Sequence, residues 1–418
     1  MISKLRFVLV HFFFFTLGLR VGQSRRELEA LFELSEDDRS LELERRLSSC
    51  RPINSIGEEV TSFKDLNSSP PLSKDRFREQ CAAEKISKGA AFGRHTAGTT
   101  GAPTNVALGR KDLSRMLAVR DYCLRHYGIK LGEREARVWG RPDKGWKGMI
   151  RNLVLNRSVF YPVGDKALDE VKRLLRSKFV YMYGYASLIL EVARLIEKYQ
   201  LDPPDLRCII CTAETVLKSQ KQYISHVLKA PVIEEYGATE FDIIAFECDE
   251  GHRHLVNPWI YVEQSDEGEC LISDMERKPK GIVRYQLGDS LKIKRTDCHL
   301  LGSTKSIDEL EGRSINRFAF VDGGKKFHAV EFARIVEGYQ LESGESFGFT
   351  IVQMGFGEFE LYAESQPEEG IRCLSDYISS EIERRLGYKI RVSPPGNQAG
   401  LSSPKFHKAG YFIQNLES

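Results

Sequence analysis

The stretch Pro231-Val-Ile-Glu-Glu-Tyr-Gly-Ala-Thr-Glu240 joins a short apolar run to a glycine turn that carries an acid. Two other short apolar runs precede it, at residues 179–182 and 208–210. Residues 168–175 and 188–199 repeat leucine, isoleucine and valine at helical spacing. Short apolar runs that alternate with helices are typical of a buried, largely parallel sheet, and we expect one here.

Beyond residue 257 the pattern changes to closely spaced strands, which predicts an antiparallel or barrel-like subdomain. A compact α+β unit follows, in which the helical pattern of residues 371–386 ends at Gly387, a natural helix C-cap. We therefore expect an α/β fold with mixed sheets, flanking helices and the barrel-like subdomain in a large N-terminal domain. The expected domains are residues 1–312, with residues 1–64 as a helical lead-in, and a small α+β domain at residues 313–418.

The composition limits the classes of function. The chain has 418 residues, and 61 Lys+Arg against 59 Asp+Glu give a net charge of +2 with both signs mixed along the sequence. A nucleic-acid-binding protein would carry a larger or more clustered positive excess, so we expect no nucleic-acid partner. Nine cysteines without a dense framework indicate free thiols in a reducing compartment, so we expect a cytoplasmic protein.

The N-terminus carries Lys4 and Arg6 before an apolar run at residues 7–19. This is the pattern of a signal peptide, and the run is too short for a transmembrane span. The alternative is an apolar helix that packs on the protein. We favour this alternative because arginines follow without a small-x-small cleavage site, and the helix then also offers a peripheral contact to a membrane.

Three segments could carry chemistry. Thr96-Ala-Gly-Thr-Thr-Gly-Ala-Pro-Thr104 combines small residues and hydroxyls, which suit a phosphate, although a plain polar turn would have the same composition. Glu240 could hold Mg²⁺ after the strand at 231–233, or it could begin an acidic helix. In Arg284-Tyr-Gln-Leu-Gly-Asp289, Asp289 could accept hydrogen bonds from a ribose diol, or it could lie in a hairpin turn.

Taken in order, these segments resemble the adenylate-forming (acyl-activating) superfamily, specifically its branch of phenylacetate–CoA ligase and the CapK-like proteins of capsule polysaccharide clusters. In that family a Ser/Thr-Gly-Thr-Thr-Gly-Lys-Pro-Thr loop precedes Tyr-Gly-x-Thr-Glu and then Arg-Tyr-x-x-Gly-Asp. A Gly-Arg pair, here Gly312-Arg313, opens a small mobile C-terminal domain. Tyr183-Gly-Tyr-Ala-Ser187 and Thr212-Ala-Glu214 resemble two further family segments, and the resemblance covers roughly residues 65–418.

The resemblance implies an ATP-dependent ligase that forms an acyl-adenylate from a small carboxylic acid, with Mg²⁺ as cofactor and coenzyme A or another thiol as acceptor. It implies that Thr99, Thr100, Glu240 (the Mg²⁺ ligand) and Lys405 are catalytic. The implied nucleotide-binding residues are Thr96, Gly98, Thr99, Thr100, Gly101, Ala213, Glu214, Tyr236, Gly237, Thr239, Glu240, Asp289 and Arg313. The implied substrate-pocket residues are Tyr183, Tyr185 and Ser187, partly aromatic and compatible with an aryl acid.

Four positions depart from the family pattern. Ala102 replaces the loop lysine, Thr212 replaces a glycine, Asn316 replaces the acidic hinge residue, and Pro404 precedes Lys405 where the family has glycine. Lys408 is the alternative to Lys405. The departures suggest a divergent substrate or acceptor, or a partial loss of catalysis.

The same branch includes members with a structural zinc site, whose spacing is similar to that of Cys248-Asp-Glu-Gly-His-Arg-His254. The resemblance implies Cys248, His254 and Cys298 as zinc ligands, with His252 or His299 as the fourth. The alternative is a vestigial site whose residues simply pack.

Two other functions stay open at this stage. One is an adenylyltransferase that acts on a hydroxyl or loads a carrier protein, and the other is a non-catalytic scaffold that binds nucleotide. Whether the chain is a monomer or a homodimer also stays open.

Overall fold

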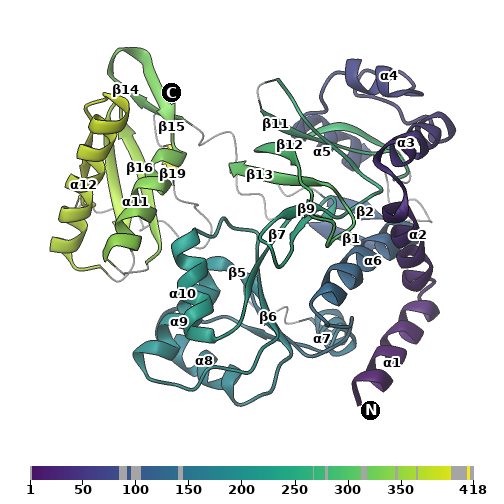
Figure 1. Cartoon of the computed structure of the whole chain (residues 1–418), viewed down its shortest axis with the longest axis horizontal. Helices are drawn as coiled ribbons and strands as arrows, with labels where there is room; N and C mark the ends of the chain where they lie inside the picture. Colours follow the sequence, from purple (N-terminus) through teal and green to yellow (C-terminus); the bar gives the residue numbers. More distant parts are fainter. Residues whose placement is uncertain are drawn as a thin grey trace.

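The computed structural model describes residues 2–83, 92–95, 105–139, 145–266, 268–277, 281–311, 318–343, 347–363, 366–396 and 412–414. Within these ranges the chain forms one eleven-stranded sheet and a smaller unit toward the C-terminus that has its own sheet (Figure 1). The strand order of the large sheet is β10-β11-β12-β13-β9-β8-β7-β6-β5-β3-β4. The prediction of an α/β fold with mixed sheets is confirmed.

One half of the large sheet is parallel and alternates with helices, as the apolar runs predict. Its strands are β3 (Glu135–Val138), β4 (Arg157–Phe160), β5 (Tyr181–Tyr185), β6 (Cys208–Thr212) and β7 (Val232–Ala238). Its helices are α7 (Trp146–Val154), α8 (Ala167–Leu175), α9 (Ala186–Lys198) and α10 (Lys218–Leu228). Every residue of β6 is buried, which explains its continuous apolar sequence, and burial raises the pKa of the Cys208 thiol to about 12.

The other half of the sheet is antiparallel and continues directly from β7. Its strands are β8 (Asp242–Glu247), β9 (Arg253–Leu255), β10 (Tyr261–Gln264), β11 (Glu269–Asp274), β12 (Ile282–Arg295) and β13 (Lys305–Glu311). These strands enclose a core that includes Phe241, Ile272 and Tyr285. Strand β12 is the longest of them, with 14 residues.

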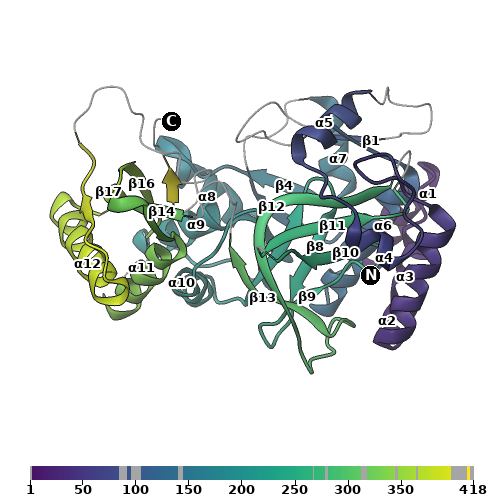
Figure 2. The same cartoon turned by 90° about the horizontal axis from the view of Figure 1, so that it is seen from above.

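The N-terminal segment lies on the side of the molecule away from the C-terminal unit (Figures 1 and 2), and its helices pack on the central strands of the large sheet. Its elements are α1 (Ile2–Thr16), α2 (Val21–Glu33), α3 (Glu36–Cys50), α4 (Phe63–Ser68), α5 (Lys74–Ala83), the hairpin β1 (Phe92–His95) and β2 (Asn105–Leu108), and α6 (Arg110–His126). Val10 and Phe14 of α1 and Leu28 of α2 are buried in the same cluster as residues of α6. Among the described helices, none alone has the length and apolarity to cross a bilayer; residues 6–16 and 21–33 meet both criteria only as a pair, bent by 101°.

The C-terminal unit has its own apolar core, which includes Phe332, Phe359 and Ile378. Its elements are β14 (Phe318–Val321), β15 (Lys325–His328), α11 (Val330–Ser343), β16 (Phe349–Gly355), β17 (Glu358–Ala363), α12 (Glu368–Leu386), β18 (Arg391–Ser393) and β19 (Phe412–Gln414). As expected, α12 ends at Gly387, whose φ of 72° is left-handed. The expected domain boundary at residues 312 and 313 lies outside the described residues.

The C-terminal unit contacts the large domain through α10. Ser219 of α10 donates a buried 2.7 Å hydrogen bond to the side chain of Gln340 in α11. Leu217, the residue before α10, packs against the core of the C-terminal unit. This contact joins the two units in the arrangement seen in Figure 1.

Candidate functional site

Several predicted site residues meet at the carboxyl ends of the central parallel strands. Tyr185, Thr212 and Glu235 are partners in register across β5, β6 and β7. Ala213 follows Thr212, and Tyr236 follows Glu235, so both lie at the same edge. In open α/β sheets, the carboxyl edge of the strands is the usual place for a ligand.

The hydroxyl of Tyr236 donates a 2.8 Å hydrogen bond to Oδ2 of Asp289. Tyr236 lies on β7 and Asp289 on β12. In the order of the sheet, three strands lie between β7 and β12. The contact is made because the antiparallel half curls over its apolar core, which brings β12 to face β7. Burial, together with the charge of Asp289, raises the pKa of Tyr236 well above its usual value, so the phenol stays protonated and donates.

Glu240 is buried in the turn between β7 and β8, and its Oε1 accepts a 2.9 Å hydrogen bond from the hydroxyl of Tyr285. The amide of Phe241 donates to the carbonyl of Ala238 at 3.1 Å, which closes the turn that includes Thr239. The alternative of an acidic helix start is therefore wrong, because β7 pairs antiparallel with β8 through this turn. A β-carbon on Gly237 would lie 2.2 Å from the carbonyl oxygen of Asp242, so only glycine fits there.

Asp289 lies inside β12 and not in a hairpin turn, so that alternative is also wrong. The preceding residue, Gly288, has a φ of 88°, and the pairing of β12 with β11 shifts register between Gln286 and Ser290. A shift of this kind marks a β-bulge, which re-aims nearby side chains. The bulge turns Asp289 toward Tyr236.

Ala213 and Glu214 form a short turn after β6. Ala213 has a φ of 64°, a left-handed conformation that costs a non-glycine residue about 1 kcal/mol. Glu214 accepts a 2.9 Å hydrogen bond from the backbone amide of Ser187 in the first turn of α9. The hydroxyl of Ser187 is buried and has no hydrogen-bond partner among the described residues, so it is available to a ligand at this edge.

Tyr185 and Tyr183 are part of an aromatic cluster with Trp139, which follows β3. The ring of Tyr185 stacks on Trp139 with 4.1 Å between centroids, and the guanidinium of Arg137 lies 4.4 Å from the centroid of Tyr183. Tyr183 also donates a 2.5 Å hydrogen bond to Glu235. Trp139 and Arg137 were not predicted from the sequence as site residues, although their two-residue spacing places both on one face of the strand.

A buried charge network connects this region to the base of the predicted phosphate loop. Arg120 of α6 lies 3.4 Å from Glu235 and 3.3 Å from Asp242, and Arg94 of β1 lies 3.2 Å from Asp242. The sequence analysis missed these residues as well; the only available signal was the charge of Glu235 within an apolar strand. Arg94 thus ties β1 to Asp242, the first residue of β8, which follows Glu240 by two positions in the sequence.

The hydroxyl-rich segment itself lies outside the described residues, which include neither Thr96, Gly98, Thr99, Thr100 and Gly101 nor Arg313 and Lys405. The ends of the loop are described, since His95 and Asn105 are antiparallel partners in the hairpin of β1 and β2. His95 and Asn105, which flank residues 96–104 in the sequence, are therefore neighbours, and Arg94 ties this hairpin to Asp242.

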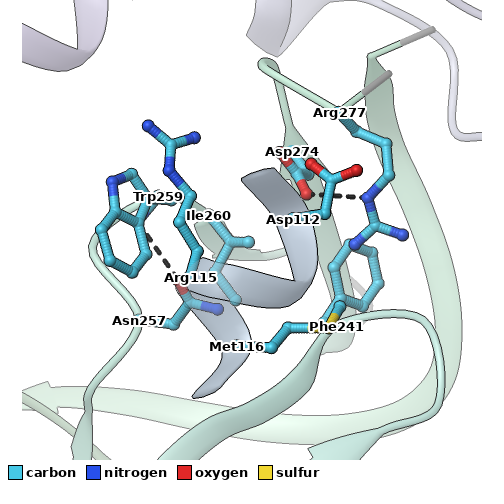
Figure 3. Close-up of a pocket in the computed structure, with 9 residues that line it drawn as sticks. All are labelled: Asp112, Arg115, Met116, Phe241, Asn257, Trp259, Ile260, Asp274 and Arg277. Atoms are coloured by element: carbon cyan, nitrogen blue, oxygen red, sulfur yellow. Dashed lines mark hydrogen bonds and ion pairs between the residues drawn. The ribbon is translucent and has the colours of Figure 1, made fainter. Parts of the chain in front are cut away.

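A small polar cavity lies behind the Glu240 turn (Figure 3). It is lined by Asp112, Arg115, Met116, Phe241, Asn257, Trp259, Ile260, Asp274 and Arg277. Arg277 pairs with Asp274 at 3.0 Å and donates a 2.5 Å hydrogen bond to the carbonyl of Glu240. Burial raises the pKa of Asp112 in this cavity. Arg277, on the wall of this cavity, therefore holds the backbone of Glu240 in place.

A second cluster combines Cys248, His252, His254 and Cys298. One ligand atom from each residue lies within 4.8 Å of the others, and the two sulfurs are 3.8 Å apart. His254 shares a 2.6 Å hydrogen bond between Nδ1 and the carbonyl of Ser303, and its Nε2 is buried without a hydrogen-bond partner among the described residues. His252 is thus the fourth member of the group, whereas His299 is exposed.

Comparisons with solved structures identify the fold. Neither protein-family profiles nor curated protein sequences match the chain. The 2-hydroxyisobutyryl-CoA ligase in complex with 2-HIB-AMP, in its post-adenylation state, aligns with a TM-score of 0.63 at 17% identity over 94% of this chain and 88% of that one. The same enzyme with 2-HIB-AMP and CoA in the thioesterification state aligns with a TM-score of 0.56 at 17% identity over 91% of each chain.

The anthranilate CoA ligase AuaEII in complex with anthranoyl-AMP aligns with a TM-score of 0.51 at 15% identity, over 73% of this chain and 63% of that chain. At this level of identity the alignments describe the architecture of the chain. The chain has the fold of the adenylate-forming ligases.

Proposed function

We propose that the chain uses ATP to activate a carboxylic acid as an acyl-adenylate and then transfers the acyl group to a thiol such as that of coenzyme A. The observation that carries the proposal is the convergence of two distant segments on one site, through the Tyr236–Asp289 and Tyr285–Glu240 hydrogen bonds. The shared fold with CoA ligases crystallised with acyl-adenylates supports the same reaction.

In the first step, a carboxylate oxygen of the acid attacks the α-phosphorus of ATP, and pyrophosphate leaves. In the second step, the thiol sulfur attacks the acyl carbon, AMP leaves with the bonding electron pair, and the thiol proton passes to solvent. Because negative charge accumulates at the phosphates, the protein assists mainly by placing donors and cations there. We assign this task to Thr99, Thr100 and Lys405.

The remaining site residues position the nucleotide in this proposal. Asp289, oriented by Tyr236, accepts hydrogen bonds from the ribose hydroxyls, with Arg313 nearby, and Ala213 and Tyr236 flank the adenine. The buried carboxylate of Glu240 fits Mg²⁺, because Tyr285 holds one of its oxygens and oxygen ligands suit this ion. Mg²⁺ would neutralise phosphate charge when bound there.

We propose an aryl acid as the substrate class. The stacked rings of Trp139 and Tyr185 lie at the same strand edge as Ala213 and offer a flat apolar surface to an aromatic ring. The resemblance to CapK-like proteins favours a place for the reaction in polysaccharide or secondary-metabolite biosynthesis in the cytoplasm.

We also propose a structural zinc ion held by Cys248, His252, His254 and Cys298. A tetrahedral zinc with bonds of about 2.3 Å to sulfur would separate two sulfurs by about 3.8 Å, the distance between Cys248 and Cys298. The hydrogen bond at Nδ1 of His254 leaves Nε2 to face the group, the usual arrangement of a metal-binding histidine.

Elemental analysis of the purified protein tests the zinc site. We expect about one equivalent of zinc, lost in Cys298→Ser and His252→Ala and retained in His299→Ala and Cys373→Ser, whose side chains are exposed. Less than a tenth of an equivalent in the unmodified protein would rule the site out.

Exchange of labelled pyrophosphate into ATP, measured over a panel of aromatic and sugar acids, tests the main proposal. Acid-dependent exchange is expected, and subsequent addition of coenzyme A should release AMP and a thioester. Exchange without thioester formation would favour adenylyl transfer to a hydroxyl or a carrier protein.

The Ala102, Asn316 and Pro404 departures favour a second candidate, a scaffold that binds nucleotide without catalysis. It predicts an ATP-induced rise in melting temperature without exchange for any acid. Absence of both exchange and the ATP-induced rise would overturn nucleotide binding itself.

A further inference from the structure

Helix α7 presents its apolar side to solvent. Trp146, Met149, Ile150 and Leu153 follow the i, i+3, i+4, i+7 pattern of an amphipathic helix, and all four are exposed. Trp146, Met149 and Leu153 retain 68%, 67% and 70% of their accessible surface. In a globular protein this stripe would normally face the core, so its exposure indicates a surface that meets an apolar environment.

Helix α1 has a second exposed apolar face. Val10 and Phe14 are buried on one side, while the opposite side carries Val8, Phe12 and Phe15, which are exposed together with the neighbouring Leu9. A helix that is apolar on all sides is normally buried all round. Here the outer face remains in contact with solvent.

The two exposed faces adjoin each other. The guanidinium of Arg6 in α1 donates hydrogen bonds to the backbone carbonyls of Leu153 and Val154 at the end of α7. Val154 packs against the same core cluster that contains Val10 and Phe14, so both helices rest on one core and turn their other sides outward. Both lie at the lower right of the molecule in Figure 1.

We call this surface the α1–α7 face. It consists of Val8, Leu9, Phe12, Phe15, Trp146, Met149, Ile150 and Leu153. These eight residues are nearly half of the seventeen large hydrophobic side chains that are exposed in the described part of the chain. Their concentration on two short helices distinguishes the face from scattered exposed residues elsewhere.

The charges of the two helices have one sign. Their sequences contain Lys4, Arg6, Lys147 and Arg151 and no acidic residue, although the whole chain has a net charge of only +2. Just beyond α1, the exposed Arg20 lies over the ring of Phe15, with 4.1 Å to the ring centroid. Apolar and aromatic side chains on two helices whose charged residues are all basic match the boundary between acyl chains and anionic headgroups.

We propose that the α1–α7 face binds the surface of a lipid bilayer that contains anionic lipids. Helix α1 has 15 residues and a length of about 22 Å, less than the roughly 30 Å of a hydrocarbon core, so it lies in the interface and does not cross it. A second copy of the chain is a poorer occupant, because two such faces would bring basic helices against each other without an acidic partner.

Binding of the full chain to vesicles tests this proposal without reference to catalysis, so its outcome is separate from that of the proposed reaction. The probes are sucrose-loaded vesicles of phosphatidylcholine alone and of phosphatidylcholine with phosphatidylglycerol. The test variants are Trp146→Ser/Leu153→Ser on α7 and Phe12→Ser on α1. The matched control is Leu41→Ser, which removes an equally exposed leucine from α3.

We expect sedimentation with the anionic vesicles, weakening as salt is added, and a partition coefficient about tenfold or more lower in Trp146→Ser/Leu153→Ser. Phe12→Ser should also lower it, whereas Leu41→Ser should bind like the unmodified chain. Brominated lipids should quench tryptophan fluorescence in the unmodified chain and much less in Trp146→Phe. Because the altered side chains are exposed, all variants should keep the melting temperature of the unmodified chain.

Three results would overturn the proposal. The first is that the unmodified chain sediments with neither kind of vesicle. The second is that Trp146→Ser/Leu153→Ser and Phe12→Ser both sediment as well as the unmodified chain. The third is that the chain does not bind vesicles but forms a dimer in analytical ultracentrifugation, which Trp146→Ser/Leu153→Ser abolishes. The last result would assign the face to a contact between copies of the chain.

Discussion

The hydroxyl of Tyr236 donates to Oδ2 of Asp289 at 2.8 Å, although 53 positions separate the two residues in the sequence. The hydrogen bond joins two segments that come together only because the sheet curls. It orients a carboxylate whose oxygens, in the proposed function, receive the ribose hydroxyls.

Replacing Tyr236 by Phe keeps the ring and removes the donor to Asp289. We expect ATP to bind about three- to tenfold more weakly, since a typical hydrogen bond contributes about 1 kcal/mol and about 1.4 kcal/mol is a tenfold change in affinity. Isothermal titration calorimetry measures the change. Tyr223→Phe, which removes a hydroxyl bonded to Glu197 away from the site, is the matched control. Equal affinity in Tyr236→Phe and the control would contradict the role of this hydrogen bond.

Replacing Glu240 by Gln keeps an oxygen that accepts from Tyr285 and removes the negative charge. We expect the Mg²⁺ concentration for half-maximal pyrophosphate exchange to rise about tenfold or more, with little loss of stability, because the hydrogen bond survives. Tyr285→Phe, which keeps the charge, should shift the Mg²⁺ dependence much less. An unchanged Mg²⁺ requirement in Glu240→Gln would argue against this carboxylate as the ligand.

Replacing Lys405 by Ala should leave ATP affinity nearly unchanged and slow adenylation by about a hundredfold or more, because the proposed charge acts in the transition state. Single-turnover formation of the acyl-adenylate measures the step. Lys408→Ala is the paired variant and should retain the rate. The opposite pattern, a slow Lys408→Ala and a normal Lys405→Ala, would move the assignment to Lys408.

Acid should weaken the attachment of the N-terminal helices. Burial alone would raise the pKa of Glu276, but a hydrogen bond from Lys111 and the charges of Arg115 and Arg46 lower it to about 2. A carboxylate with a lowered pKa in the folded protein stabilises it above the pKa of the unfolded chain, and the stabilisation is lost as pH falls toward 2. After allowance for solvent screening, this amounts to about 1–2 kcal/mol.

Urea unfolding between pH 7 and pH 3 measures this effect. Glu276→Gln should be less stable at pH 7, and its stability should fall less steeply from pH 5 downward than that of the unmodified protein. The control is Glu58→Gln. It removes a carboxylate that forms no ion pair among the described residues. Parallel pH profiles for Glu276→Gln and the unmodified protein would show that the network contributes little.

The repeating parts of the fold could be predicted from sequence because their patterns are local. The spacing of Leu188 and Val192 indicated α9, and the apolar run at Cys208 indicated β6. The end of α12 followed from Gly387, since a left-handed residue is needed there. In each case, residues within a few positions of each other determine the element.

The site could be predicted only in part, because its contacts join segments far apart in the sequence. The sequence suggested Tyr236 and Asp289 as residues of one site, with a hairpin turn as the alternative for Asp289, whereas a bulge inside β12 turns it toward Tyr236. Arg120 and Arg94 gave no local signal, because their roles arise from partners on other elements, and the spacing of Trp139 and Arg137 indicated a shared face but not the rings they meet. Long-range ion pairs and ring stacking leave little trace in residue spacing.

The contact between α10 and the C-terminal unit has a consequence for turnover. Ser219 and Gln220 donate hydrogen bonds across it to Gln340 and to the carbonyl of Phe347, and each such bond contributes only about 1 kcal/mol. Each unit keeps a complete core of its own. A reorientation of the smaller unit would therefore cost little more than these bonds and would leave both cores folded, so that in the proposed reaction the unit could open and close with each turnover.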